Sequence, residues 1–145
     1  MKYLILGGRS YLGRSFTEFL KKNKHQVITL NEANSSNYSN NVLKEVLKKE
    51  NPQKIVDFKF PIVSSNDEDF NNINLDEIIS TQKRLIEALD QSPDNTSDLY
   101  LISTLNINKR KNIYTKYKKK QEDYYKTKLP RKNKLKILRL ENVLG

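Results

Sequence analysis

The chain alternates between short apolar runs and longer segments in which apolar residues recur with the period of a helix. The apolar runs predict buried strands at 2–6, 25–30, 54–58, 99–104 and 134–140. The periodic segments predict amphipathic helices at 11–22, 74–90 and 112–128, and a further helix that includes Val42 to Leu47 and ends near Asn51. Strands that alternate with helices indicate an α/β fold, a doubly wound parallel sheet with helices on both faces.

Length and composition limit the class of protein. At 145 residues the chain suits one domain, 1–145, and is too short for a cofactor domain plus a full substrate domain. It contains no cysteine and a single histidine, His25, so we expect no disulfide and no metal site. No apolar stretch reaches the roughly 18 residues of a membrane span, and the apolar start is too short for a secretory signal. We therefore expect a cytoplasmic protein without membrane contact.

The net charge of +10 is concentrated in one segment. Residues 109–136 carry thirteen Lys or Arg and two acids, a local balance of +11 that leaves about −1 for the rest of the chain. Such a segment attracts phosphates or nucleic acid. The sequence has neither glycine–arginine repeats nor the aromatic pattern of an RNA-binding sheet. A solvated helix face with a lysine-rich loop is therefore the favoured interpretation, and nucleic acid is the less favoured partner.

The first predicted strand runs into a glycine-containing turn, ILGGRSYLG at 5–13, and then into a helix. The spacing is Gly7-x-x-Ser10-x-x-Gly13. Glycines let the backbone approach a phosphate closely, and the free N–H groups at a helix start favour negative charge. The turn therefore predicts a phosphate site. The alternative is a tight strand–helix turn that binds no ligand.

Tyr114 and Lys118 stand four residues apart in a predicted helix, so their side chains share one face. A lysine ammonium beside a phenol lowers the phenol's pKa, which suits it to general acid/base catalysis near neutral pH. Tyr124 and Lys128 have the same spacing, but they leave too little helix before the next strand. Tyr114 and Lys118 are therefore the preferred pair.

Three segments in their order resemble the extended short-chain dehydrogenase/reductase superfamily, which includes nucleotide-sugar epimerases and dehydratases: ILGGRSYLG at 5–13, YTKYKKKQE at 114–122 and ILRLENVLG at 137–145. The turn is similar to the superfamily's GxxGxxG motif, with Ser10 in place of the middle glycine, and is close to the form found in an atypical branch. The resemblance covers essentially the whole chain, which corresponds to the N-terminal half of a typical member. It implies a Rossmann fold that binds NAD or NADP.

By this resemblance, the dinucleotide's pyrophosphate would lie against the 7–13 turn, at Gly7, Arg9, Ser10, Tyr11, Leu12 and Gly13. Asn31 occupies the place where an acidic residue usually binds the adenine ribose of NAD. An asparagine can bond a ribose hydroxyl without repelling a 2′-phosphate, which Arg9 could reach. The choice between NAD and NADP stays open, with a slight preference for NADP.

The resemblance also implies a reaction and the residues for it. Tyr114 would be the acid/base, Lys118 would hold the nicotinamide ribose, and Thr104 would bind the substrate oxygen. Asn142, in the third segment, would line the substrate site. The implied chemistry is hydride transfer to or from a hydroxyl or keto carbon, on a nucleotide-activated sugar.

The chain departs from the superfamily's pattern in several places. Ten largely polar residues, 31–40, join the second strand to the next helix, so we expect the third strand of the sheet to be missing. Phe58 and Lys59 are bulky where members usually have small residues against the adenosine. The substrate half does not fit within 145 residues, so a fragment, a compact relative and a scaffold without catalysis remain as explanations.

Two expectations concern partners. Members of the superfamily often pair through the two helices that correspond to 74–90 and 112–128, so the resemblance implies a homodimer. The alternative function, from a different class, is a non-catalytic nucleotide- or RNA-binding protein that uses the basic segment 109–136.

Overall fold

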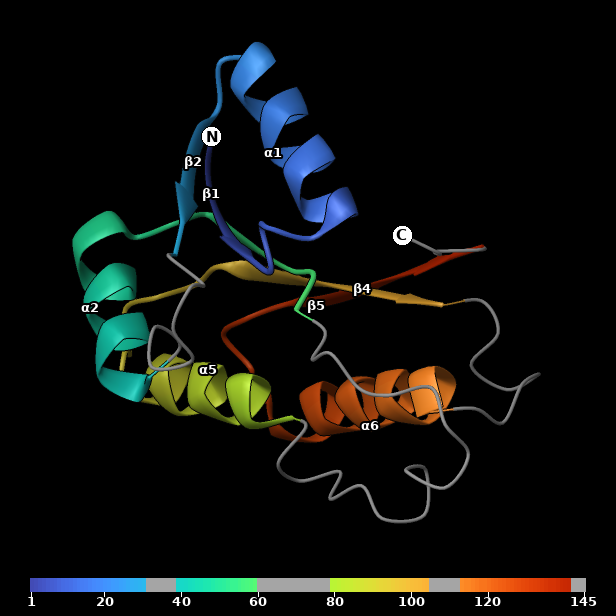
Figure 1. Ribbon diagram of the computed structural model, residues 1–145. Coiled ribbons are helices and arrows are strands. Elements are labelled where there is room, and N and C mark those ends of the chain that lie inside the picture. Colours follow the sequence, from blue (N-terminus) through green and yellow to red (C-terminus); the bar gives the residue numbers. More distant parts are fainter. Residues whose placement is uncertain (31–38, 60–78, 105–112, 142–145) are drawn as a thin grey trace.

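The computed structural model of the chain describes residues 1–30, 39–59, 79–104 and 113–141. Within them, five strands form one parallel sheet in the order β2-β1-β3-β4-β5 (Figure 1). The strands are β1 Lys2–Leu6, β2 Gln26–Thr29, β3 Lys54–Asp57, β4 Asp98–Thr104 and β5 Leu135–Leu140. The connecting helices are α1 Tyr11–Lys22, α2 Asn40–Glu50, α5 Ser80–Asp90 and α6 Ile113–Lys128. The predicted α/β class and doubly wound parallel sheet are confirmed.

The local sequence accounts for where the elements begin and end. α1 starts after the N-cap Ser10 and α2 after the N-cap Ser39, and each serine hydroxyl accepts a hydrogen bond from a backbone N–H in the first turn. α2 stops at Asn51, which takes the left-handed conformation with φ of 43°. The helix expected at 74–90 is seen from Ser80, because residues 60–78 lie outside the described part of the chain.

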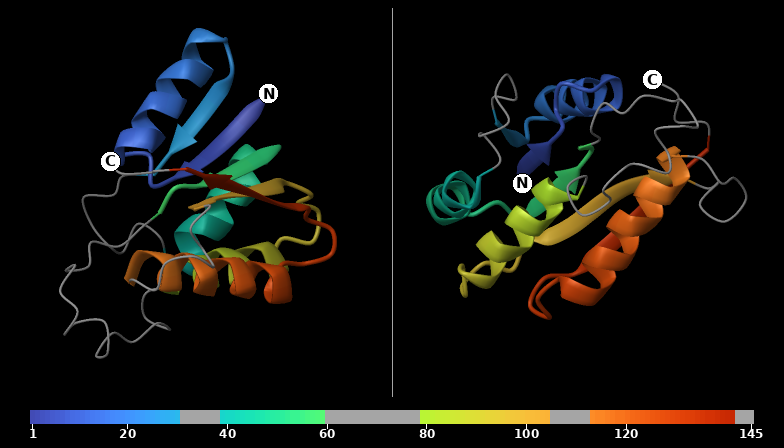
Figure 2. Two further views of the ribbon diagram at one scale, coloured as in Figure 1. Left: turned by 90° about the vertical axis from the view of Figure 1, so that its right-hand side faces the viewer. Right: turned by 60° about the horizontal axis from the view of Figure 1, so that its bottom comes forward.

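Among the described strands, β2 lies at one edge of the sheet; residues 31–38, where the third strand was expected to be missing, lie outside the described part of the chain, so that expectation stays a prediction. The chain moves from β1 to β2 in one direction and then returns past β1 to β3, β4 and β5. Because such crossovers are right-handed, α1 lies on one face of the sheet and the other three helices lie on the opposite face (Figures 1 and 2).

The two faces carry different cores. Under α2, α5 and α6 lies the larger cluster, which includes Leu4, Leu6, Leu85, Leu99 and Leu101. On the α1 face the cluster is small and consists of Ile5, Leu20, Val56 and Ile102 with neighbours.

Among the helices in the described part of the chain, none has both the length and the apolar composition that crossing a membrane requires.

Candidate functional site

The strand order reverses between β1 and β3, and ligands of open α/β sheets bind in the crevice outside the carboxyl ends of the strands at such a point. Gly7 follows β1 there and has φ of +75°. A Cβ on Gly7 would lie 2.6 Å from the carbonyl carbon of Phe58 and 2.7 Å from the nitrogen of Lys59, which follow β3. Glycine therefore allows the end of β1 to pass directly against the end of β3.

Ser10 closes the turn that leads into α1. Its hydroxyl donates to the Gly7 carbonyl at 2.8 Å and accepts from the Gly13 N–H at 3.0 Å, while its own N–H donates to the Gly7 carbonyl at 3.1 Å. The first backbone bond of the helix runs from the Arg14 N–H to the Ser10 carbonyl. The N–H groups of Tyr11 and Leu12, in the first turn, therefore have no acceptor within the helix.

Gly13 packs against the same turn from the helix side. A Cβ there would fall well inside contact distance of the Gly7 carbonyl oxygen and 2.9 Å from the Gly8 Cα. Both motif glycines are thus required by the backbone's contacts with itself. What the turn offers outward are the amides of Tyr11 and Leu12 at the positive end of a helix, a donor set that fits a diphosphate.

Some of the other residues predicted for the cofactor and the substrate are described by the structure, and others are not. Arg9 and Tyr11 are exposed beside the turn, with Tyr11 at 65% exposure. Asn31 and Asn142 lie outside the described residues, so their assignments to ribose and substrate remain predictions. Thr104 is buried at the carboxyl end of β4, the strand next to β3 in the sheet.

Tyr114 and Lys118 lie together on α6, as their spacing predicts. The Lys118 Nζ is 5.9 Å from the centre of the Tyr114 ring. It donates to the Ile102 carbonyl at 2.9 Å and to Gln121 Oε1 at 3.1 Å, and the side chain is almost fully buried. Because Ile102 lies on β4 two residues before Thr104, the lysine ties the helix to the strand that carries the predicted hydroxyl.

Burial governs the ionisation of this pair. Loss of solvent lowers the pKa of Lys118 to about 8, although the nearby carboxylates of Asp57 and Glu122 oppose the shift. Loss of solvent also raises the pKa of Tyr114. The sequence led us to expect the opposite direction for the phenol. The ammonium lies near the tyrosine ring and is hydrogen-bonded to a carbonyl and an amide, so burial dominates at the hydroxyl.

The lowered pKa predicts that Lys118 makes stability depend on pH. Between pH 8 and 10.5 the unfolded chain binds the proton more tightly than the folded one, so the free energy of unfolding should rise with pH, by about 3 kcal/mol over the window. Lys118→Met removes this titration. Urea unfolding at a series of pH values should therefore show the wild type gaining on the variant from pH 8 upward. A constant difference between the two would contradict the prediction.

A buried acid that the sequence analysis did not single out organises the same edge of the sheet. Asp57, the last residue of β3, has no exposed surface. It accepts hydrogen bonds from the Tyr125 hydroxyl at 2.6 Å, from Gln82 Nε2 at 3.1 Å and from the Lys59 N–H at 2.7 Å. Its donors come from α5, α6 and the segment after β3, so this carboxylate joins three parts of the chain.

Gln121 extends this network toward the glycine turn. Its Nε2 donates to the Tyr117 hydroxyl at 2.8 Å and to the Lys59 carbonyl at 3.1 Å. Tyr117, Gln121 and Tyr125 recur at a spacing of four, so one face of α6 is polar and yet buried against the sheet. Two features of the sequence could have indicated this buried network: the acid inside the apolar run KIVDF, and the three polar side chains of α6 that recur every four residues.

Ser103 and Arg139 have structural roles. The Ser103 hydroxyl donates to Glu122 Oε2 at 2.6 Å, and the Arg139 guanidinium makes a two-pronged contact with the same carboxylate at 2.6 and 3.2 Å. Burial raises the pKa of Glu122, but the hydrogen bonds from Arg139 and Ser103, together with the charges of Arg139 and Lys126, outweigh it and hold the pKa below its ordinary value. The assignment of Thr104 as the hydroxyl that binds the substrate oxygen stays a prediction.

The basic segment is partly neutralised on α6. Lys119 lies 3.5 Å from Asp123, and Lys126 lies 3.8 Å from Glu122. Lys116 and Lys128 are exposed on the same helix. These contacts are typical of a solvated helix face.

No family model matches the chain, and no curated protein sequence matches it either. Solved structures do match. The fold is that of nucleotide-sugar epimerases and reductases. The matches include the enzyme WbmG of Bordetella bronchiseptica in complex with NAD, with a TM-score of 0.72, 17% identity, and 100% of this chain and 54% of that chain covered. UDP-glucose 4-epimerase of Brucella ovis in complex with NAD matches with a TM-score of 0.72, 15% identity, and coverage of 95% and 51%.

A third match is the dTDP-4-dehydrorhamnose reductase of Bacillus anthracis in complex with NADP, with a TM-score of 0.71, 17% identity, and coverage of 97% and 53%. The chain therefore spans about half the length of the structures that it matches. The resemblance that the motifs indicated is confirmed at the level of the fold, and these identities are too low to carry function by themselves.

Proposed function

We propose that the chain is the dinucleotide-binding domain of an NAD(P)-dependent oxidoreductase or epimerase that acts on a nucleotide-activated sugar. The observation that carries the proposal is the glycine turn at the switch point, with the Tyr11 and Leu12 amides available at the start of α1. The matched structures support it, because several were solved with NAD or NADP and include enzymes named for nucleotide sugars.

In this proposal the diphosphate lies against the amides of the first turn of α1, where the helix dipole stabilises negative charge. Arg9, exposed beside the turn, adds a positive charge within the same region. Asn31 binds the adenine ribose. Because no acid among the proposed ribose contacts repels a 2′-phosphate, NADP is slightly preferred over NAD.

The dinucleotide supplies a hydride acceptor or donor when it is bound. Tyr114 then exchanges the proton with the substrate oxygen, and the hydroxyl of Thr104 holds that oxygen. Lys118 fixes the position of Tyr114 by joining α6 to the Ile102 carbonyl. Its ammonium would also bind the nicotinamide ribose.

A single backbone N–H can be removed to test the binding site. Tyr11→Pro deletes the amide at the first helical position, where proline is well tolerated. Ser10 before it has φ of −65° and ψ of 161°, a conformation that suits a residue preceding proline. We expect calorimetry to show dinucleotide affinity falling by about tenfold, the equivalent of one charge-assisted hydrogen bond, without loss of stability.

Tyr11→Ala is the matched control, since it removes the same side chain and keeps the amide. Tyr114→Phe should also bind the dinucleotide normally, and it should lose whatever turnover of a UDP- or dTDP-linked hexose the wild type shows in the same assay. Equal binding by Tyr11→Pro and Tyr11→Ala would contradict the proposed site. Absence of dinucleotide binding, together with RNA affinity that falls steeply with salt, would favour the alternative based on 109–136.

A further inference from the structure

Gln121 lies one turn after Lys118 on α6 and is fully buried. Its Oε1 accepts a hydrogen bond from the Lys118 Nζ at 3.1 Å. Its Nε2 donates to the Lys59 carbonyl at 3.1 Å and to the Tyr117 hydroxyl at 2.8 Å. One amide therefore joins the lysine of the predicted acid/base pair to the backbone that follows β3.

These hydrogen bonds fix which way round the Gln121 amide lies. The Lys59 carbonyl can only accept, so the amide nitrogen must face it. The reversed amide would set its NH₂ group against the Lys118 ammonium and its oxygen against the Lys59 carbonyl, which are two contacts without a donor–acceptor match. The contacts at the nitrogen of the amide therefore turn its oxygen toward Lys118.

The Lys59 backbone also borders the glycine turn. Its nitrogen is 2.7 Å, and its Cα 2.9 Å, from the point that a Cβ on Gly7 would occupy. The carbonyl that Gln121 binds belongs to the same residue. A single segment after β3 therefore contacts the predicted phosphate site on one side and the amide that binds Lys118 on the other.

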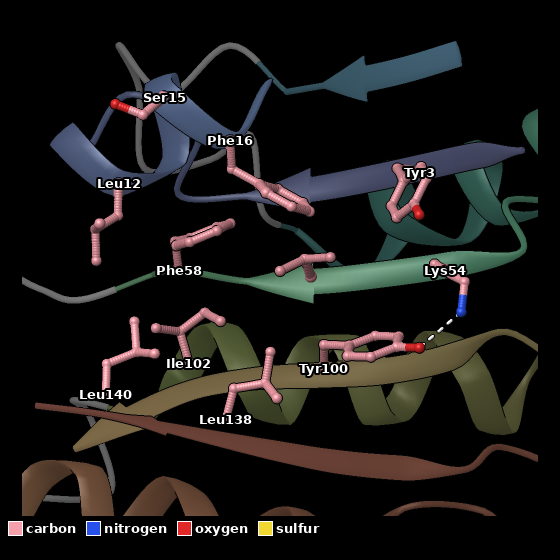
Figure 3. Close-up of a pocket in the computed structure, with 11 residues that line it drawn as sticks. Tyr3, Leu12, Ser15, Phe16, Lys54, Phe58, Tyr100, Ile102, Leu138 and Leu140 are labelled. Carbon is pink, nitrogen blue, oxygen red and sulfur yellow. Dashed lines mark hydrogen bonds between the residues drawn. The ribbon is translucent and has the colours of Figure 1, made fainter. Parts of the chain in front are cut away.

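Lys118 is anchored at a second strand as well. Its Nζ donates to the Ile102 carbonyl on β4 at 2.9 Å, in addition to its bond to Gln121. Figure 3 shows the Ile102 side chain on the face of the sheet that carries α1, so α6, on the opposite face, reaches this residue through its backbone. The two acceptors, one on β4 and one tied to the segment after β3, fix the ammonium across two neighbouring strands.

The charged and titratable groups that face Lys118 come from β3 and α6. Asp57 and Glu122 favour its charged form, and the rings of Tyr114 and Tyr117 each lie 5.9 Å from the Nζ. A hydrogen-bond acceptor also stabilises an ammonium relative to the neutral amine. Replacing the neutral Gln121 thus changes the contacts of the ammonium and leaves every charge around it in place.

We propose that Gln121 is a positioning residue for Lys118, which holds the ammonium near the carboxyl ends of β3 and β4 by joining it to the Lys59 carbonyl. The inference rests on the proposed function only for what the ammonium then contacts, the nicotinamide ribose. Because the segment at Lys59 also borders Gly7, one run of backbone sets both the diphosphate contact and the ribose contact. Loss of the Gln121 amide should weaken the second contact and leave the first.

The titration of Lys118 in the free protein tests the positioning. In NMR spectra of the chain ¹³C-labelled at the lysine Cε, the signal that Lys118→Met lacks should titrate near pH 8. Gln121→Met has a similar length and removes the acceptor, so it should lower the midpoint by about one pH unit. Gln121→Glu replaces the neutral oxygen by a carboxylate and should raise the midpoint. Loss of packing alone would not move the two variants in opposite directions.

Leu47→Ala is the matched control for lost stability, because it truncates a buried side chain on a different helix, α2, and should leave the midpoint unchanged. The wild type also gives a reading that needs no substitution at Gln121. The Gln121 Nε2 signals should shift with the same midpoint as Lys118, whereas those of the exposed Gln91 should not. Gln121 signals that do not follow Lys118, or a midpoint that neither substitution of Gln121 moves, would overturn the proposal.

Dinucleotide binding distinguishes this inference from the proposed function. In calorimetry, Gln121→Met should bind NADPH about tenfold more weakly than the wild type and should bind ADP, which has no nicotinamide ribose, equally well. Equal losses for both ligands would show that Gln121 supports the whole site rather than Lys118, and the inference would be wrong. If the wild type binds neither ligand, the proposed function fails, and the titrations of Lys118 and Gln121 still decide the role of Gln121.

Discussion

Asp57→Ala should lower the free energy of unfolding by about 3–5 kcal/mol, at the upper end of the range for single substitutions. The carboxylate is fully buried and accepts from Tyr125, Gln82 and the Lys59 N–H. Alanine leaves these three donors without their acceptor in a buried site. Urea unfolding followed by circular dichroism measures the loss.

Asp57→Asn separates the loss of hydrogen bonds from the loss of volume. It keeps the shape, but its amino group must face one of the donors that Asp57 now accepts from, so we expect a smaller loss of about 1–3 kcal/mol. The substitution should also move the pKa of Lys118 below about 8, because the Asp57 charge raises that pKa in the wild type. Equal stability of the alanine variant and the wild type would show that the network is not formed.

Gly13→Ala should prevent the strand–helix turn from closing. The added methyl group would meet the Gly7 carbonyl oxygen and the Gly8 Cα, which are backbone atoms that cannot rotate away. We expect a loss of at least about 3 kcal/mol in the free energy of unfolding, larger than ordinary overpacking. Because the turn also presents the Tyr11 and Leu12 amides, NAD(P)H binding should be lost in calorimetry even at temperatures where the variant is folded.

Gly8→Ala is the control for this substitution. A Cβ on Gly8 would lie 3.4 Å from the Thr29 Cγ2, an ordinary contact with a side chain. Its stability should stay within about 0.5 kcal/mol of the wild type. If Gly8→Ala and Gly13→Ala behaved alike, the distances of the turn would not explain the motif.

The elements could be predicted because their signals are local. The apolar run before Gly7 and the helical period of residues 11–22 extend over only a few residues of sequence, and the observed elements lie close to the predicted ones. Tyr114 and Lys118 could be paired for the same reason, since spacing alone puts them on one face of α6. The ionisation of that pair could not, because it depends on how deeply α6 is buried.

The partners of Asp57 show most clearly which contacts cannot be predicted from local sequence patterns. Tyr125 is 68 residues away in sequence and Gln82 is 25 away, so neither contact leaves a pattern in a local window. The role of Ser103 is of the same kind, since its acceptor Glu122 comes from the following helix. The contact assigns Ser103 to the support of Glu122, which the sequence alone could not do.

The amino-acid sequence by itself determined the order and type of the elements and the chemistry at each position, because periodicity, caps and turns act over a few residues. Tertiary structure decided the rest. It brought Asp57, Gln121 and Lys118 into one buried polar layer and lowered the pKa of Lys118. Each of these depends on which segments are packed together and how much water they exclude, and neither quantity is a property of a single segment.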